Sequence, residues 1–438
     1  MYIALKNKKF TDEDRVCRDR RLYNTVMTNK MSMLQAVKIK EGVYWVGAID
    51  WNIRDYHGYT LPGTTYNAYL VLGEKVALID GTYPGHEWQM IERIESVIPL
   101  EKIDYIVANH IEIDHSGSLP MLAKKLPNVP IYMTEVAKKG FARHYDTKDW
   151  NIHTIKNLEA LELGGKTLTF LEAPFLHWPD SMFTYLGEDK VLFPNDAFGQ
   201  HIASSARFDD ELGIDEAMEH AAKFVANLIV PLSPKVLKKL GEVTELGVPI
   251  EMIAPSHGII WRSHAADIIN AYVAWANGVS KNKITIVYDT MHYSTGTAAQ
   301  YIAEGAISEG VEVKFDLLKD GRYEGVHRSD VVRDILDSKA VIVGSPTLED
   351  YPLPTVAGFL YYLAGIRPGK QAQKKIGFAF GSNGGKGGAP KVITELMQKA
   401  GIEIWHEPVE FTYRPQAEDK EMFFKLGQEI AKAVKQMP

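Results

Sequence analysis

The sequence predicts a two-domain α/β protein whose C-terminal part is a doubly wound parallel sheet. The chain of 438 residues is longer than one hydrophobic core usually supports. From about residue 281 onward, strand-like and helix-like segments alternate regularly, which is the pattern of β/α units around a parallel sheet. We therefore expect a domain boundary near residue 280.

The N-terminal part mixes short strands with interposed helices. Runs of β-branched, aromatic and other apolar residues between Gly, Pro and Asn turns predict strands, whereas apolar residues at helical spacing predict helices. The expected strands are 42–49, 65–72, 75–79, 103–108, 167–171, 182–186 and 191–194, and the expected helices are 85–98, 216–230 and 234–246.

Five β/α units fill the C-terminal part. The expected strands are 284–288, 312–315, 340–343, 375–380 and 403–405, and the helices that follow them are 297–308, 330–336, 354–363, 389–399 and 420–434. Ligands of such sheets bind at the carboxyl ends of the strands, so the loops there are candidate binding loops.

Composition excludes several classes of protein. The net charge of −7 argues against a nucleic-acid binder, and the single cysteine, Cys17, excludes internal disulfides, cysteine-ligated zinc and Fe–S clusters. We find no apolar run near the ~20 residues of a membrane span and expect a cytoplasmic protein. Residues 1–31 are highly charged and lack the apolar core of a signal peptide. We expect a disordered extension there, or a basic docking arm, with the folded part beginning at Met31 or Met33.

Six consecutive residues hold four potential metal ligands. His110 and Glu112 stand two apart in an extended segment and project to one side, while Asp114 and His115 enter a helix and can face a second ion. Further candidate ligands on loops near strand ends are His177, Asp196 and His257. We interpret the more isolated histidines as surface or structural residues, namely His86, His144, His153, His220, His264, His327 and His406.

The order of these ligands resembles that of the metallo-β-lactamase superfamily, which usually has His where this chain has Glu112. An added carboxylate favours iron over zinc. With a flavodoxin-like domain following, residues 33–436 resemble the flavodiiron proteins. The resemblance implies a metallo-β-lactamase-like αββα sandwich (32–280) followed by a flavodoxin-like doubly wound parallel sheet (281–438).

The resemblance also assigns the metal ligands. It implies that His110, Glu112 and His177 hold one iron, that Asp114, His115 and His257 hold the other, and that Asp196 bridges the two. His57 and His201 are expected near the metals in supporting roles, and no catalytic residue is expected beyond the metal site itself.

Three C-terminal loops are candidates for binding FMN. The loop at residues 289–297 resembles the flavodoxin phosphate loop, although Ser/Thr-rich turns also cap helices. The glycines of the loop at residues 381–388 permit close approach of the backbone to a ligand. The expected contacts are Thr290, Met291, His292, Tyr293, Ser294 and Thr295; Pro346, Thr347, Leu348, Glu349, Asp350 and Tyr351; and Ser382, Asn383, Gly384 and Gly385. Gly385-Lys386 replaces an aromatic residue common in the family, so we expect Tyr351 or another residue to stack on the flavin. Neither Gly385-Lys386 nor Gly165-Lys166-Thr167 has the upstream Gly of a nucleotide P-loop.

The function implied by the resemblance is reduction of O2 to water, or of NO to N2O, at two iron ions supplied with electrons by FMN. Without CxxC pairs the chain has no rubredoxin module, so an external donor such as rubredoxin is expected. The resemblance further implies a head-to-tail homodimer or a homotetramer. The alternatives are a dizinc hydrolase fused to a flavodoxin-like domain, and an electron carrier or oxygen sensor with a vestigial metal site. The preference between O2 and NO stays open.

Overall fold

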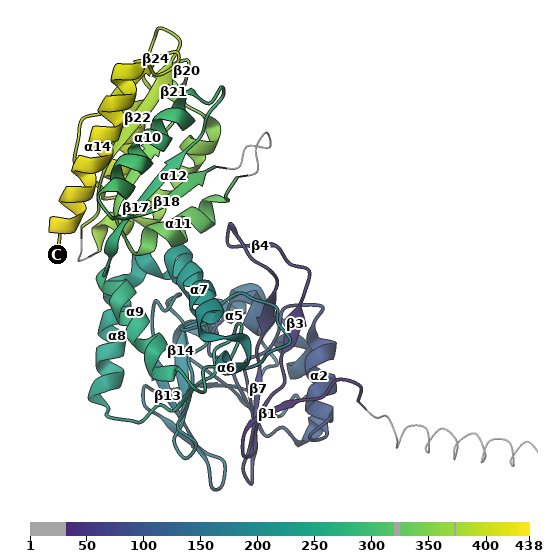
Figure 1. Cartoon of the computed structure of the whole chain (residues 1–438). Helices are drawn as coiled ribbons and strands as arrows, with labels where there is room; N and C mark the ends of the chain where they lie inside the picture. Colours follow the sequence, from purple (N-terminus) through teal and green to yellow (C-terminus); the bar gives the residue numbers. More distant parts are fainter. Residues whose placement is uncertain (1–31, 319–324, 372–373) are drawn as a thin grey trace, which may run out of the picture.

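The computed structural model describes residues 32–318, 325–371 and 374–438. The expectations for residues 1–31 lie outside this range. The chain forms two α/β domains, one following the other along the molecule (Figure 1).

The N-terminal domain is built on two sheets that face each other. The first has the order β1 (Val37–Lys40), β2 (Val43–Trp45), β7 (Tyr69–Leu72), β8 (Val76–Ile79), β9 (Tyr105–Val107), β10 (Ile131–Met133) and β11 (Ile152–Thr154). The second has the order β12 (Ala160–Glu162), β13 (Thr167–Glu172), β14 (Met182–Leu186), β15 (Val191–Phe193) and β16 (Met252–Ile253). Two short ribbons, β3 (Ala48–Asp50) with β6 (Thr64–Tyr66) and β4 (Asp55–Tyr56) with β5 (Tyr59–Thr60), stand apart from both sheets.

Helices cover the outer face of each sheet. Strand alternation explains the layers, because Tyr69 and Val71 of β7 pack between the sheets while Leu70 packs under the helices. The first sheet is covered by α2 (Glu87–Glu95), α4 (Leu119–Lys125) and α5 (Glu135–His144), and the second by α7 (Ile214–Phe224), α8 (Ser233–Glu245) and α9 (Ala265–Asn277). The remaining helical segments are η1 (Leu100–Lys102), α3 (Ile113–Ser116), α6 (Asp209–Leu212), η2 (Val225–Ile229) and η3 (Val230–Leu232). The expected αββα sandwich is confirmed.

The C-terminal domain contains the expected parallel sheet, in the order β18, β17, β19, β22, β23. In chain order this is 2-1-3-4-5, the flavodoxin-like arrangement. The strands are β17 (Lys281–Tyr288), β18 (Glu312–Leu317), β19 (Ser338–Gly344), β22 (Ile376–Asn383) and β23 (Glu403–Ile404), with a small ribbon of β20 (Thr347–Leu348) and β21 (Tyr351–Pro352). One face packs on α10 (Ser294–Ser308) and α14 (Ala417–Gln436), the other on α11 (Arg328–Leu336), α12 (Pro354–Ile366) and α13 (Ala389–Lys399). A 3-10 turn, η4 (Pro368–Lys370), follows α12.

Several segments differ from expectation, and the helices α4, α5 and α9 and the strands β1, β10, β11 and β12 were not predicted. The expected strand 42–49 is two strands, β2 and β3, and Gly47 between them approaches the next strand so closely that a Cβ there would lie 2.3 Å from the Tyr66 carbonyl. The expected helix 216–230 begins as α7 but continues as the π-helical turn η2. The fifth strand is shorter than predicted, and β24 (Val409–Thr412) pairs with the carboxyl end of β22 beyond it.

One hydrophobic core joins the two domains. It runs from the outer face of the second sheet, through α7, α8 and α9, to α11, α12 and α13 of the C-terminal domain. The connection is short, since α9 ends at Asn277, Gly278 caps it in the left-handed conformation and β17 begins at Lys281. Over the described ranges, no helix is both long and apolar enough to cross a membrane.

Candidate metal centre and flavin site

The seven predicted metal ligands lie on segments that follow strands of the N-terminal domain. His110 and Glu112 follow β9, and Glu112 is the N-cap of the four-residue helix α3, which carries Asp114 and His115. His177 follows β13, Asp196 follows β15 and His257 follows β16. The strand ends thus deliver ligands from both sheets to one place.

The first group of ligand atoms contains His110, Glu112, His177 and one oxygen of Asp196. The Nε2 atom of His177 lies 3.3 Å from both Glu112 Oε2 and Asp196 Oδ2. The Nε2 atom of His110 lies 3.4 Å and 3.6 Å from the same two oxygens. Four possible donors therefore surround one position.

The second group contains Asp114, His115 and His257. The Nε2 atom of His115 lies 3.3 Å from Asp114 Oδ1, and that of His257 lies 3.1 Å from Asp114 Oδ2. Both imidazoles also face Asp196 Oδ1, at 3.0 Å and 3.4 Å. Asp196 therefore presents one carboxylate oxygen to each group.

These residues fit two metal ions. Octahedral or tetrahedral bonds of about 2.1 Å place neighbouring ligand atoms about 3.0–3.4 Å apart, close to the separations found here. Among the described residues, buried polar atoms without a hydrogen-bond partner include His110 Nε2, Glu112 Oε2, Asp114 Oδ1 and Asp196 Oδ2. Lone pairs gathered this way in a buried site need a cation between them.

The ionisation of the carboxylates supports the same conclusion. Burial alone would raise the pKa of Glu112, but the imidazoles of His110, His177 and His57 around it together hold that pKa well below its usual value. The pKa of Asp196 is likewise lowered against burial, chiefly by His115. Both groups are therefore anionic, which suits hard cations.

Two of the ligands are oriented from behind. The Nδ1 atom of His110 lies 2.9 Å from Asp180 Oδ2, and that of His257 lies 2.6 Å from the Thr65 carbonyl. Such contacts fix which ring nitrogen faces a metal. Sequence reasoning missed Asp180, although it stands three residues after His177, because nothing in the pattern distinguishes it from a loop carboxylate.

His57 and His201 both lie beside the two groups. His57 lies on the turn of the β4–β5 ribbon, and its Nε2 atom lies 2.9 Å from Glu112 Oε1. The His201 ring lies 4.3 Å from that of His257, and its Nδ1 atom bonds the Thr64 hydroxyl at 2.7 Å. Burial, and then the neighbouring His257 and His57, lowers the pKa of His201 well below its usual value, so its imidazole is neutral.

The three predicted flavin loops meet around one cavity of about 280 Å³. Predicted contacts that line it are Thr290, Met291, His292, Ser294, Pro346, Thr347, Ser382, Asn383 and Gly384. The rest lie on the same loops without lining it, namely Tyr293, Thr295, Leu348, Glu349, Asp350, Tyr351 and Gly385. Thr295 and Ser382 tie two of the loops together through their hydroxyls, 2.9 Å apart.

Tyr413 also lines this cavity, and sequence reasoning missed it. It follows β24, the strand that was not predicted, and its amide donates to the Asn383 carbonyl at 2.9 Å. Its aromatic ring is therefore a candidate, besides Tyr351, for stacking on the flavin. The N-terminal end of α10, beginning at Ser294, is the kind of helix end that suits a phosphate.

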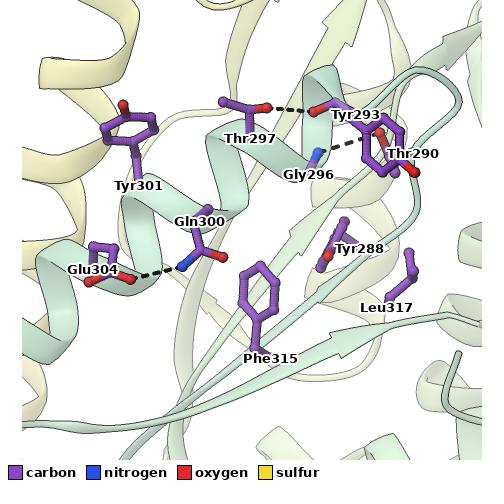
Figure 2. Close-up of a pocket in the computed structure, with 10 residues that line it drawn as sticks. All are labelled: Tyr288, Thr290, Tyr293, Gly296, Thr297, Gln300, Tyr301, Glu304, Phe315 and Leu317. Atoms are coloured by element: carbon purple, nitrogen blue, oxygen red, sulfur yellow. Dashed lines mark hydrogen bonds between the residues drawn. The ribbon is translucent and has the colours of Figure 1, made fainter.

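A second cavity of about 550 Å³ lies on the other side of the 290–297 turn. Figure 2 shows Phe315 of β18 facing Gln300 and Glu304 of α10, with Tyr293 and Thr290 at the upper end. Thr290 lines both cavities. Of the predicted site residues, Thr290 and Tyr293 alone border this second cavity.

Comparison with known proteins matches both halves of the chain. Residues 64–258 match the family model described as ODP family beta lactamase, and residues 286–427 match the flavodoxin model. The chain is 50% identical to coenzyme F420H2 oxidase of Methanocaldococcus jannaschii, covering 91% of this chain and 97% of that protein. It is 44% identical to nitric oxide reductase of Moorella thermoacetica, with 91% and 99% covered. The solved structure of rubredoxin oxygen:oxidoreductase from Desulfovibrio gigas superposes with a TM-score of 0.86 at 40% identity, covering 92% of this chain and 99% of that one.

Proposed function

The chain belongs to the flavodiiron proteins, and from this we propose that it reduces O2 to water or NO to N2O. When bound, FMN would supply electron transfer, and the two iron ions would supply binding and reduction of the gas. The observation that carries the proposal is Asp196, which offers Oδ2 to one group of ligands and Oδ1 to the other. A shared carboxylate holds two metals close enough to act on one small molecule together.

We assign the ligands as the resemblance implies. His110, Glu112 and His177 would hold one iron, Asp114, His115 and His257 would hold the other, and Asp196 would be shared between them. Asp180 and the Thr65 carbonyl keep the imidazoles of His110 and His257 turned toward the metals. The domains are taken as residues 32–280 and 281–438.

The supporting groups have separate tasks. His57 holds the Glu112 oxygen that faces away from His110 and His177, which limits rotation of that carboxylate. His201 adds a neutral imidazole beside His257, with its Nε2 atom unpaired within the described structure. Both therefore shape the site without belonging to the seven predicted ligands.

The external donor is proposed to be rubredoxin or a similar small redox protein, as the sequence predicts. The name of the Desulfovibrio gigas structure supports this choice, whereas the 50% identical relative is named for coenzyme F420H2. F420H2 is therefore the competing donor. The flavin-domain loops offer an exposed apolar surface for docking, with Leu348, Tyr351 and Tyr413 all exposed.

We further propose a head-to-tail homodimer or a tetramer built from such dimers. The flavin loops at β20, β21 and β24 lie at the end of the C-terminal domain remote from the metal domain (Figure 1). Electrons leaving the flavin of one chain therefore need the metal centre of another. Trp51, Trp88 and Phe175 of the metal domain are exposed apolar side chains that such a contact would cover. The cytoplasmic location stays a prediction.

The test combines composition with turnover. Purified protein is analysed for iron, zinc and FMN, reduced anaerobically by rubredoxin or by F420H2, and then given O2 or NO in parallel assays. We expect two irons and one FMN per chain and rapid consumption of at least one gas. Zinc without flavin would support the hydrolase instead, and bound iron that neither gas oxidises would support an electron carrier or sensor.

A further inference from the structure

The ribbon of β4 and β5 places His57 beside the metal centre. Its turn consists of His57 and Gly58, both with left-handed backbone (φ 53° and 78°), as in a type I′ hairpin. The ribbon pairs with no other strand in the described part of the chain. Two strands of two residues are too short to be stable alone, so other contacts must hold this turn in place.

Part of the support comes from the beginning of α11, in the C-terminal domain. The Arg328 guanidinium donates to the Gly58 carbonyl at 3.1 Å, directly next to His57. The Thr60 amide donates to Ser329 Oγ at 3.2 Å. Both partners belong to the flavodoxin-like domain, although the ribbon belongs to the metal domain.

A partly buried polar cluster secures this junction. Lys223 of α7 donates to Thr60 Oγ1 at 3.1 Å and to Asp330 Oδ1 at 2.6 Å. Asn227 donates to the Ser329 carbonyl at 3.1 Å and lies in the π-helical turn η2. π-Helical turns are uncommon and frequent at functional sites, and this one aims an amide at the first turn of α11.

We propose that Arg328 and Ser329 of the flavodoxin-like domain are positioning residues for His57, so that this domain determines where the imidazole stands beside Glu112. The inference rests on the proposed metal centre but not on which gas it reduces. Tyr59, packed in the core shared by both domains, anchors the ribbon from its other side.

The consequence for the metal centre follows from the two oxygens of Glu112. Oε2 faces His110 and His177, whereas Oε1 is held by His57 at 2.9 Å. If the ribbon shifts, Oε1 loses this partner, and the Glu112 carboxylate becomes free to rotate out of the orientation in which Oε2 faces His110 and His177. Contacts behind a ligand commonly tune a metal site in this way.

The first test measures amide exchange in full-length, metal-free protein. Arg328→Ala and Thr60→Val each remove hydrogen bonds at the junction, and we expect amides of residues 55–61 to exchange about tenfold faster in both. Thr60→Ser keeps the hydroxyl and should exchange like wild type. The matched control is Arg333→Ala, on the same helix, because Arg333 bonds Glu219 of the N-terminal domain at 2.6 Å.

The second test reports on the metal centre without turnover. Each variant is reconstituted with Co(II), whose visible absorption depends on ligand geometry. Arg328→Ala and Thr60→Val should shift the spectrum in the same direction as His57→Ala, while Thr60→Ser and Arg333→Ala should match wild type. Unchanged exchange and spectra in Arg328→Ala and Thr60→Val would overturn the proposal, as would an equal effect of Arg333→Ala. Neither readout depends on reduction of O2 or NO, so the outcome is separate from that of the proposed function.

Discussion

The Nδ1 atom of His110 lies 2.9 Å from Oδ2 of Asp180, and the same oxygen accepts the Ile111 amide at 2.8 Å. This contact turns the opposite ring nitrogen toward the metal position. Asp180→Ala removes both hydrogen bonds, and we expect metal affinity to fall about 10- to 100-fold. Competition with a chelator measures the change.

Asp180→Asn separates charge from geometry. An amide oxygen in the place of Oδ2 keeps both hydrogen bonds, so the loss of affinity should be smaller than in Asp180→Ala. Asp149→Asn, at an exposed position, serves as the control and should bind metal like wild type. Equal losses in the alanine and asparagine variants would show that charge alone accounts for the effect.

Asp196 and Asp114 should differ in how many ions they hold. Asp196 faces both groups of ligands, whereas Asp114 faces only His115 and His257. We expect Asp114→Ala to keep about one iron per chain and Asp196→Ala to keep less than one. Elemental analysis of the purified variants measures this, and a full complement of iron in Asp196→Ala would contradict the bridging role.

Tyr413 should contribute to flavin binding by stacking. Aromatic stacking is worth about 0.5–1.5 kcal/mol, so Tyr413→Leu should weaken FMN binding roughly 2- to 10-fold. Tyr361→Leu is the control, since Tyr361 is 71% exposed and Tyr413 is 70% exposed, but Tyr361 does not line the flavin cavity. Fluorescence titration with FMN gives the affinities. A larger effect of Tyr351→Leu would assign the stacking to Tyr351 instead.

A head-to-tail dimer predicts that two inactive variants restore each other. Asp196→Ala is expected to lack a complete pair of irons, and Ser294→Glu is expected to repel the FMN phosphate. Co-expressed with different tags, they should show about a quarter of wild-type activity, because half of the dimers are mixed and each has one working pair of sites. Electron transfer within one chain would leave the mixture inactive.

Asp316 should make stability depend on pH. Burial, and then the neighbouring Asp334, raises its pKa from 3.8 to about 7, and its Oδ2 atom has no hydrogen-bond partner among the described residues. The folded state thus holds the proton more tightly than the unfolded state between about pH 4 and pH 7. Stability falls as pH rises through this window, and the loss persists above it.

Asp316→Asn removes this loss. At pH 8 we expect the variant to be about 2–4 kcal/mol more stable than wild type in urea unfolding, with little difference near pH 4. Glu312→Gln, an exposed change on the same strand, is the control. A stability difference that does not vary with pH would argue against titration of Asp316.

Much of the fold could be predicted because periodicity follows burial. The central C-terminal strands β17, β19 and β22 are largely buried and appear as apolar runs. The helix 389–399 was predicted with its observed bounds. Short strands such as β10 and β11 were missed because three residues carry no recognisable period. The π-helical turn was missed because its sequence has ordinary helical spacing.

The candidate site divides along similar lines. The metal ligands could be recognised because several of them stand close together in the sequence. Asp180 and the Thr65 carbonyl could not be recognised in the sequence. Only the folded chain brings Asp180 to Nδ1 of His110 and the Thr65 carbonyl to Nδ1 of His257. Tyr413 depended on β24, whose pairing with β22 is a tertiary contact without local pattern.

The core that crosses the domain boundary has a mechanical consequence. With α7, α8 and α9 packed into the same apolar layer as α11, α12 and α13, the linker after Gly278 cannot work as a hinge. A swing of the flavodoxin-like domain toward the metals would first have to open that layer to water. The flavin loops are therefore held apart from the metal ligands of the same chain, and the proposed transfer of electrons between chains would need no movement of one domain against the other.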